Sequence, residues 1–312
     1  MKRDKTLSVI GVQLDEGACR RGVDMGPSAI RYAGLPSMLS DLGYKVVDWG
    51  DVVCDVLSDE AMEAAVSYIP AKKRKNLNSV FAVNNINTKL YHRVRDVLEE
   101  GHFPIIIGGD HALAAGSITA VQSIYRNVGV IWVDAHGDFN DADISLTGNM
   151  HGMPLSAVTG FGPDEMLPFK EEEAPYIDPK KVALIGARLL DEEEKKKLRK
   201  SGVTVFTTAD IDKLGMAEVM RRAIDIAGTG TSGIHVSYDL DGIDPSSAIG
   251  VGTPVNGGIT YREAHLIAEL LYESGKLVSL EVVELNPILD RRNQTGEIAA
   301  ELVASLMGKT IY

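Results

Sequence analysis

Three short segments of the chain concentrate side chains that bind divalent metal ions, and each segment follows an apolar run. They are Gly108–His111, Asp134–Asp138 and Asp239–Asp241. Carboxylates gathered at the ends of buried strands repel one another and are costly to bury unless cations neutralise them. Two metal ions roughly 3.5–4 Å apart can lower the pKa of a shared water and provide hydroxide at ordinary pH. The segments therefore predict a binuclear metal site with hydrolytic chemistry.

The predicted ligands are His111, Asp134, His136, Asp138, Asp239 and Asp241. Side chains at i, i+2 and i+4 of an extended segment point the same way, so those of one segment can converge on one point. A set rich in carboxylates and free of thiolates suits manganese, for which cobalt, nickel or iron can substitute. A lone Asp-x-His or Asp-x-Asp is usually a solvated loop or a helix cap, but three such segments after apolar strands favour metal binding.

The elements that position these segments alternate between apolar, β-branched runs and amphipathic stretches. The runs predict strands at Leu7–Val12, Lys45–Asp48, Phe103–Ile107, Val128–Asp134, Val182–Ala187, Val203–Thr207, Ile234–Asp239 and Leu277–Leu285. The stretches predict helices at Gly26–Leu42, Val80–Glu100, Ala112–Tyr125, Asp191–Lys200, Met216–Ala227, Thr260–Ser274 and Gly296–Met307. Such alternation indicates one three-layer α/β domain over residues 1–312, with a parallel sheet of about eight strands and helices on both faces. Ligands of such sheets bind beyond the carboxyl ends of the strands, where all three metal segments fall.

Composition narrows the classes of partner. The 312 residues include 32 Lys and Arg against 44 Asp and Glu, a formal charge of −12. This balance argues against nucleic acid as a partner and is compatible with a small cationic substrate. No apolar segment is long enough to span a membrane, and Leu7–Val12 is too short for a signal peptide, so we expect a cytoplasmic protein. The two cysteines, Cys19 and Cys54, imply no disulfide framework.

Further motifs accompany the metal segments and together resemble one family. They are Gly22–Pro27, Ser237–Pro245, Gly252–Pro254, Gly257–Glu263 and Glu284–Pro287. With the metal segments, they resemble the ureohydrolases, the manganese enzymes that include arginase and agmatinase. Within the family the chain is most similar to arginases, because Asp138–Asn140 and Thr147–Gly152 resemble the stretch that holds the amino-acid end of arginine. Arginases usually have serine where Thr147 stands.

The resemblance implies a reaction and a role for each site residue. It implies an arginase-like fold and hydrolysis of L-arginine to L-ornithine and urea by a hydroxide that bridges two Mn²⁺ ions, with Asp134 and Asp239 shared between the metals. Asp138 would carry a proton to the leaving amine, His151 would shuttle protons with a pKa near neutrality, and Glu284 would orient the guanidinium. The implied substrate-binding residues are Asn140, Thr147, Asn149, Asp191 and Thr253. The family also implies a homotrimer or a homohexamer.

Two other functions fit the same residues. Agmatinase, or another hydrolase of guanidino compounds, would share the metal site but would need no contacts to an α-carboxylate. A catalytically silent metal-binding module would keep the ligands but would have no use for His151 and Glu284. Turnover of arginine compared with agmatine separates the enzymes, and urea release by manganese-loaded protein excludes the silent module.

Overall fold

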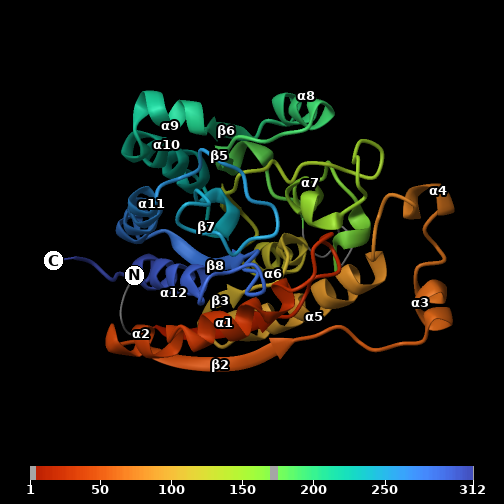
Figure 1. Ribbon diagram of the computed structural model, residues 1–312, viewed down its shortest axis with the longest axis horizontal. Helices are drawn as coiled ribbons and strands as arrows, with labels where there is room; N and C mark the ends of the chain where they lie inside the picture. Colours follow the sequence, from red (N-terminus) through yellow and green to blue (C-terminus); the bar gives the residue numbers. More distant parts are fainter. Residues whose placement is uncertain (1–4, 169–174, 312) are drawn as a thin grey trace.

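An eight-stranded sheet forms the centre of the computed structural model, which describes residues 5–168 and 175–311 (Figure 1). The strands are β1 (Thr6–Val12), β2 (Lys45–Val52), β3 (Phe103–Ile107), β4 (Val128–Val133), β5 (Val182–Ala187), β6 (Thr204–Thr207), β7 (Gly233–Asp239) and β8 (Leu277–Val283). Their order is β2-β1-β3-β8-β7-β4-β5-β6, and every neighbouring pair is parallel. The predicted parallel α/β sheet is confirmed.

Helices cover both faces of the sheet because apolar side chains leave each strand on both sides. Ile131 and Val133 of β4 join one core cluster, whereas Val130 and Trp132 join the other. The first cluster includes side chains from α1 (Gly26–Tyr32), α2 (Leu35–Asp41), α9 (Thr208–Leu214), α10 (Met216–Gly228), α11 (Tyr261–Ser274) and α12 (Gln294–Leu306). The second includes side chains from α5 (Val80–Glu99), α6 (Ala114–Tyr125), α7 (Pro154–Val158) and α8 (Glu192–Ser201). The three-layer arrangement expected from the sequence follows.

Two of the sequence-based boundaries that were wrong have a local backbone reason. The helix predicted over Gly26–Leu42 is divided into α1 and α2, because Gly34 adopts a left-handed φ of 91° and Pro36 lies in the first turn of α2. The strand predicted to reach Leu285 ends at Val283, because Glu284 has a φ of 68°. Both breaks turn the chain where a regular element could have continued.

Several helices had no clear signal in the sequence. Besides α7 and α9, these are α3 (Asp59–Ala65) and α4 (Ala71–Arg74), which lie away from the sheet in Figure 1. Neither α3 nor α4 contains a buried residue, so neither needs an apolar stripe. The loop predicted over residues 161–181 contains two short 3-10 turns, Asp164–Met166 and Pro179–Lys181, and its residues 169–174 lie outside the described part. Among the described helices, none combines the length and apolar character required to cross a bilayer.

The central strands bring the metal segments to one edge of the sheet. β3, β8, β7 and β4 are consecutive neighbours, and the carboxyl ends of β3, β4 and β7 lead directly into the three segments. β8 leads into Glu284 at the same edge. Because parallel strands end at a common edge, segments more than 100 residues apart along the chain converge there.

The close packing of β4 against α10 predicts a specific sensitivity. A Cβ added at Gly129 would lie 1.9 Å from the backbone oxygen of Ala227. We therefore expect Gly129→Ala to lower the free energy of unfolding by roughly 1–3 kcal/mol through overpacking, measured by denaturant unfolding. Gly152→Ala is the matched control, since no heavy atom lies within 4 Å of its added Cβ. Equal stability of the two variants would contradict the tight β4–α10 contact.

Candidate metal centre and active site

Two groups of histidine and aspartate side chains lie at the carboxyl edge of the sheet and share one residue. His111, Asp134 and Asp239 form one group, and Asp134, His136 and Asp241 form the other. The Nδ1 atom of His111 is 3.3 Å from Asp134 Oδ2 and 3.0 Å from Asp239 Oδ2. The Nδ1 atom of His136 is 3.4 Å from Asp134 Oδ1 and 3.1 Å from Asp241 Oδ2. The two oxygens of Asp134 therefore face different groups, as a bridging carboxylate requires.

Asp138 adds a further carboxylate to the first group and increases the crowding of negative charge. Its Oδ2 lies 3.1 Å from His111 Nδ1, and its backbone adopts a left-handed φ of 48°. Burial and then the charge of Asp134 raise the pKa of Asp138 to about 7. Burial and then the charges of Asp241 and Asp134 raise the pKa of Asp239 well above its ordinary value. These buried carboxylates oppose one another's ionisation, so the site favours added positive charge.

A buried relay sets the orientation of the His111 ring. Glu281 is 0% exposed, and it accepts hydrogen bonds from the hydroxyls of Ser237, at 2.7 Å, and Ser117. Burial raises the pKa of Glu281, but the nearby His235 ring outweighs burial and holds that pKa below its ordinary value. The Ser237 hydroxyl therefore donates its proton to Glu281. The same hydroxyl oxygen accepts a hydrogen bond from His111 Nε2 at 2.7 Å. A neutral His111 therefore turns an Nδ1 lone pair toward the aspartates.

Bound divalent cations would satisfy these carboxylate and imidazole atoms better than contacts within the protein do. A lone pair of His111 facing several carboxylates is repulsive unless a cation lies between them. Hydrogen bonds also fix the carboxylates: Trp132 Nε1 donates to Asp134 Oδ2 at 2.9 Å, and Thr253 Oγ1 donates to Asp241 Oδ2 at 2.9 Å. Partners of this kind orient metal ligands. Carboxylate oxygens with imidazole nitrogens and no thiolate suit ions of the manganese type.

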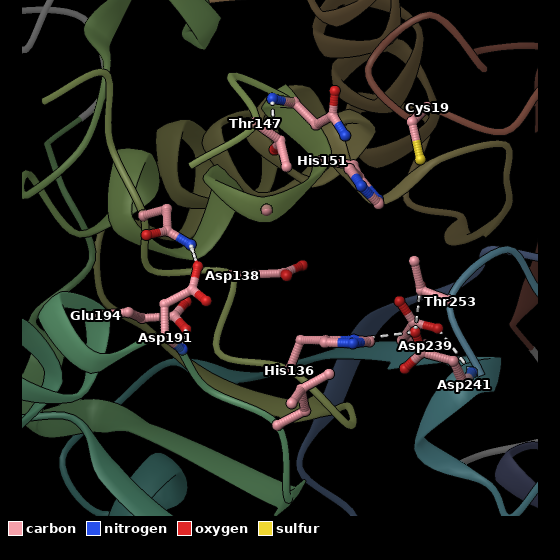
Figure 2. Close-up of a pocket in the computed structure, with 14 residues that line it drawn as sticks. Cys19, His136, Asp138, Thr147, His151, Asp191, Glu194, Asp239, Asp241 and Thr253 are labelled. Carbon is pink, nitrogen blue, oxygen red and sulfur yellow. Dashed lines mark hydrogen bonds and ion pairs between the residues drawn. The ribbon is translucent and has the colours of Figure 1, made fainter. Parts of the chain in front are cut away.

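A pocket opens beside these groups and contains most of the predicted site residues (Figure 2). Those that line it are His136, Asp138, Asn140, Thr147, Asn149, His151, Asp191, Asp239, Asp241 and Thr253. In Figure 2, Thr147 and His151 lie across the pocket from His136, Asp239 and Asp241. His111, Asp134 and Glu284 are buried and do not line the pocket. The pocket thus runs from the metal-ligand candidates to the polar loop that contains Thr147 and Asn149.

Glu284, which is buried, pairs with the partly buried His151 next to the first metal-ligand group. Glu284 Oε1 lies 3.0 Å from His151 Nδ1 and accepts a hydrogen bond from the backbone N–H of His111 at 2.9 Å. Burial lowers the pKa of His151, but the charge of Glu284 outweighs it and raises that pKa to about 9. This value is above the near-neutral pKa expected from the sequence, because Glu284 is the ring's partner. The left-handed φ of 68° at Glu284 is the kind of backbone strain that gathers at functional sites.

The start of α8 lines the part of the pocket that lies away from Asp239 and Asp241 (Figure 2). Asp191 is the N-cap of this helix and forms a capping box with Glu194. Asn140 Nδ2 donates to Asp191 Oδ2 at 3.3 Å, and Glu194 Oε1 accepts from the backbone N–H of Phe139 at 2.9 Å. Glu194 and Cys19 line the pocket but were not predicted as site residues; for Glu194, the Asp-x-x-Glu spacing was an available signal. Two carboxylates at this end suit a cationic group.

Comparisons with known proteins agree with this geometry. The sequence profile described as "Arginase family" matches residues 5–308. A protein named arginase from Bacillus subtilis is 49% identical over 311 residues, covering 99% of both chains. The arginase of Bacillus caldovelox is 45% identical, covering 98% of this chain and 99% of its own. A crystal structure of Bacillus subtilis arginase superposes with a TM-score of 0.89 at 47% identity, covering 99% of this chain and 100% of the other.

The relay behind His111 yields a binding prediction. Ser237→Ala removes the hydroxyl that connects His111 to Glu281, so we expect affinity for Mn²⁺ to fall roughly 10- to 100-fold. Calorimetric titration of chelator-stripped protein measures this change. Ser279→Ala is the matched control, because Ser279 is a buried serine of the same strand as Glu281 but contacts His235 instead of His111. Equal loss of affinity in both variants would contradict a specific role for the relay.

Proposed function

The chain belongs to the arginase family, and on that premise we propose that it hydrolyses L-arginine to L-ornithine and urea with two Mn²⁺ ions. The observation that carries the proposal is the pair of histidine–aspartate groups that share Asp134 at the floor of a polar pocket. His111, Asp134, Asp138 and Asp239 would hold one ion. Asp134, His136, Asp239 and Asp241 would hold the other. The ions would supply a hydroxide nucleophile at ordinary pH by lowering the pKa of a bound water.

Glu284 would receive the guanidinium of the substrate. A carboxylate and a planar guanidinium suit bidentate pairing, and Glu284 is already held by the backbone N–H of His111. A bound guanidinium would replace His151 as the cation beside Glu284 and free the His151 ring to exchange protons with solvent. The pairing of His151 with Glu284 supports this exchange of partners. In this scheme His151 carries protons only when substrate occupies the pocket.

Asp138 would transfer a proton between the reacting groups. Attack on the guanidinium carbon gives a tetrahedral species, and its collapse breaks the bond to the substrate's δ-nitrogen. The proton released by the attacking water must reach that nitrogen for the amine to leave. Asp138 lines the pocket and lies beside His111, so its carboxyl group would lie near both the attacking water and the leaving nitrogen of a bound substrate. Urea and ornithine would then leave through the pocket.

The far end of the pocket would bind the amino-acid portion of the substrate. Asp191 would accept the α-ammonium group, and the amides and hydroxyl of Asn140, Asn149 and Thr147 would bind the α-carboxylate. Agmatine has no α-carboxylate and could not use these amide and hydroxyl donors. This end of the pocket is therefore the reason for preferring arginine over agmatine. Thr253 lines the pocket as well, and its hydroxyl fixes Asp241.

The organisation of the enzyme is part of the same proposal. Residues 1–312 would act as one ureohydrolase domain, because a single sheet contributes all the metal ligands. We propose a cytoplasmic homotrimer or homohexamer, as in the sequence-based expectation. Sedimentation analysis of the purified protein would measure the oligomeric state.

Substrate preference provides the direct test. We expect manganese-loaded enzyme to release urea from L-arginine faster than from agmatine at equal concentration. Asn149→Ala should raise KM for arginine by roughly tenfold or more, since a hydrogen bond to a charged group contributes about 1.5–3 kcal/mol. The same variant should change agmatine hydrolysis far less. Steady-state urea release with both substrates gives both quantities.

A matched control and three contrary outcomes define this test. Asn85→Ala makes the same substitution at a surface contact with Asp55, so it should leave both substrates unaffected. Equal or better wild-type turnover of agmatine would refute the substrate assignment. A parallel loss for both substrates in Asn149→Ala would remove the reason for preferring arginine. Complete inactivity with two metals bound would favour a silent metal-binding module.

A further inference from the structure

The turn between α4 and α5 makes a set of hydrogen bonds to the polar loop of the pocket. Asn78 donates from its backbone N–H to the oxygen of Gly148 at 2.9 Å. Its side-chain Nδ2 donates to the backbone oxygen of Thr147 at 3.0 Å and to Asn149 Oδ1 at 3.1 Å. Asn78 does not line the pocket, but every one of these contacts is to a residue of the Thr147–Asn149 segment.

The backbone around Asn78 fixes the position of its side chain although that side chain is exposed. Leu77 and Val80 are buried on either side of it, and Ser79 between them adopts a left-handed φ of 55°. From the opposite side, Gly148 has a φ of 75°, and a Cβ added there would lie 3.2 Å from the backbone of Asn76. The two chain segments are therefore in direct contact, and the turn presents Asn78 to the loop in a defined orientation.

The chemistry of the acceptors determines which way each amide faces. The backbone oxygen of Thr147 can only accept a hydrogen bond, so the side-chain atom of Asn78 beside it must be the nitrogen. The second hydrogen of that nitrogen then points to Asn149, which must present its oxygen. Both protons of Asn78 Nδ2 are used in this way. Asn149 lines the pocket, and with its oxygen bound to Asn78 its NH₂ group remains as a hydrogen-bond donor.

We propose that Asn78 is a positioning residue that sets the amide orientation of Asn149 and thereby selects substrates that carry a carboxylate. The inference rests on the proposed function and extends it by one residue outside the pocket. With its oxygen held by Asn78, Asn149 offers a hydrogen-bond donor to an anionic group. If the amide were reversed, an oxygen would face that group and repel it. Preference for arginine over agmatine would then depend on Asn78 as well as on the residues that touch substrate.

The replacement Asn78→Asp tests this orientation because it removes both donors and keeps the size of the side chain. The new carboxylate would face two oxygens, so the Asn149 amide should reverse to donate to it. We expect KM for L-arginine to rise about tenfold with little change in kcat, and agmatine kinetics to change less than about twofold. Asn78→Ala removes the donors without adding charge and should give a smaller rise in KM for arginine. Steady-state urea release in manganese-loaded enzyme measures each value.

A control and a double variant separate orientation from general loop support. Asn76→Ala is the control, since Asn76 Nδ2 donates to Ala142 of the same loop but does not reach Asn149. It should leave the ratio of arginine to agmatine turnover unchanged. In an Asn149→Ala background, Asn78→Asp should have no further effect on KM for arginine, because the two residues act through one amide. Additive effects, or a KM rise in Asn76→Ala equal to that in Asn78→Asp, would overturn the proposal.

Binding of two products keeps this test separate from the proposed reaction. L-ornithine and 1,4-diaminobutane differ only by the carboxylate, and calorimetry compares them without turnover. We expect Asn78→Asp to weaken ornithine binding about tenfold and to leave diaminobutane binding unchanged. Wild-type enzyme that releases no urea from arginine would defeat the proposed function. Wild-type enzyme that prefers arginine, with the same preference in Asn78→Asp, would defeat only the inference about Asn78.

Discussion

The structure depends on one electrostatic constraint: the Nδ1 atom of His111 lies within 3.3 Å of carboxylate oxygens from three aspartates. The relay through Ser237 to the buried Glu281 assigns the ring proton to the far nitrogen. Burial lowers the pKa of His111, but the aspartates outweigh burial and raise that pKa well above its ordinary value, so the Nδ1 position beside them favours positive charge. Divalent cations are the natural source of that charge, and the pocket, the loops and the chemistry are arranged around them.

The parallel sheet provides this arrangement through its topology. Strands β3, β8, β7 and β4 are adjacent although they are distant along the chain, so their carboxyl ends deliver histidine and aspartate residues to one edge. Backbone strain occurs at two residues of that edge. Asp138 and Glu284 both have left-handed backbones, and each directs its carboxylate toward the His111 region rather than continuing a regular element. Rigid strands thus hold a site whose individual members would not stay together unaided.

The sequence predicted the sheet and the gathering of histidine and aspartate side chains at its carboxyl edge, because both leave short-range signals. Apolar β-branched runs end at the metal segments. Spacing predicted that the side chains within one segment would converge, and the shared carboxyl edge of a parallel sheet predicted that the segments would meet. The sequence could not predict that Glu281, Ser237 and Trp132 support the ligand candidates, because these residues lie inside strands and their contacts depend on side-chain packing. Breaks set by single backbone angles, as at Gly34 and Glu284, were also missed. The contact of Asn78 with Asn149 joins residues 71 positions apart and had no local signal.

Diffraction from crystals grown with excess Mn²⁺, collected at the manganese absorption edge, shows directly whether paired cations occupy this site. We expect two anomalous peaks per chain, one beside His111 Nδ1 and the other beside His136 Nδ1, with an oxygen of Asp134 bound to each. A vacant pocket, a single peak, or dispersal of the six side chains would contradict the claim that paired cations hold this site together.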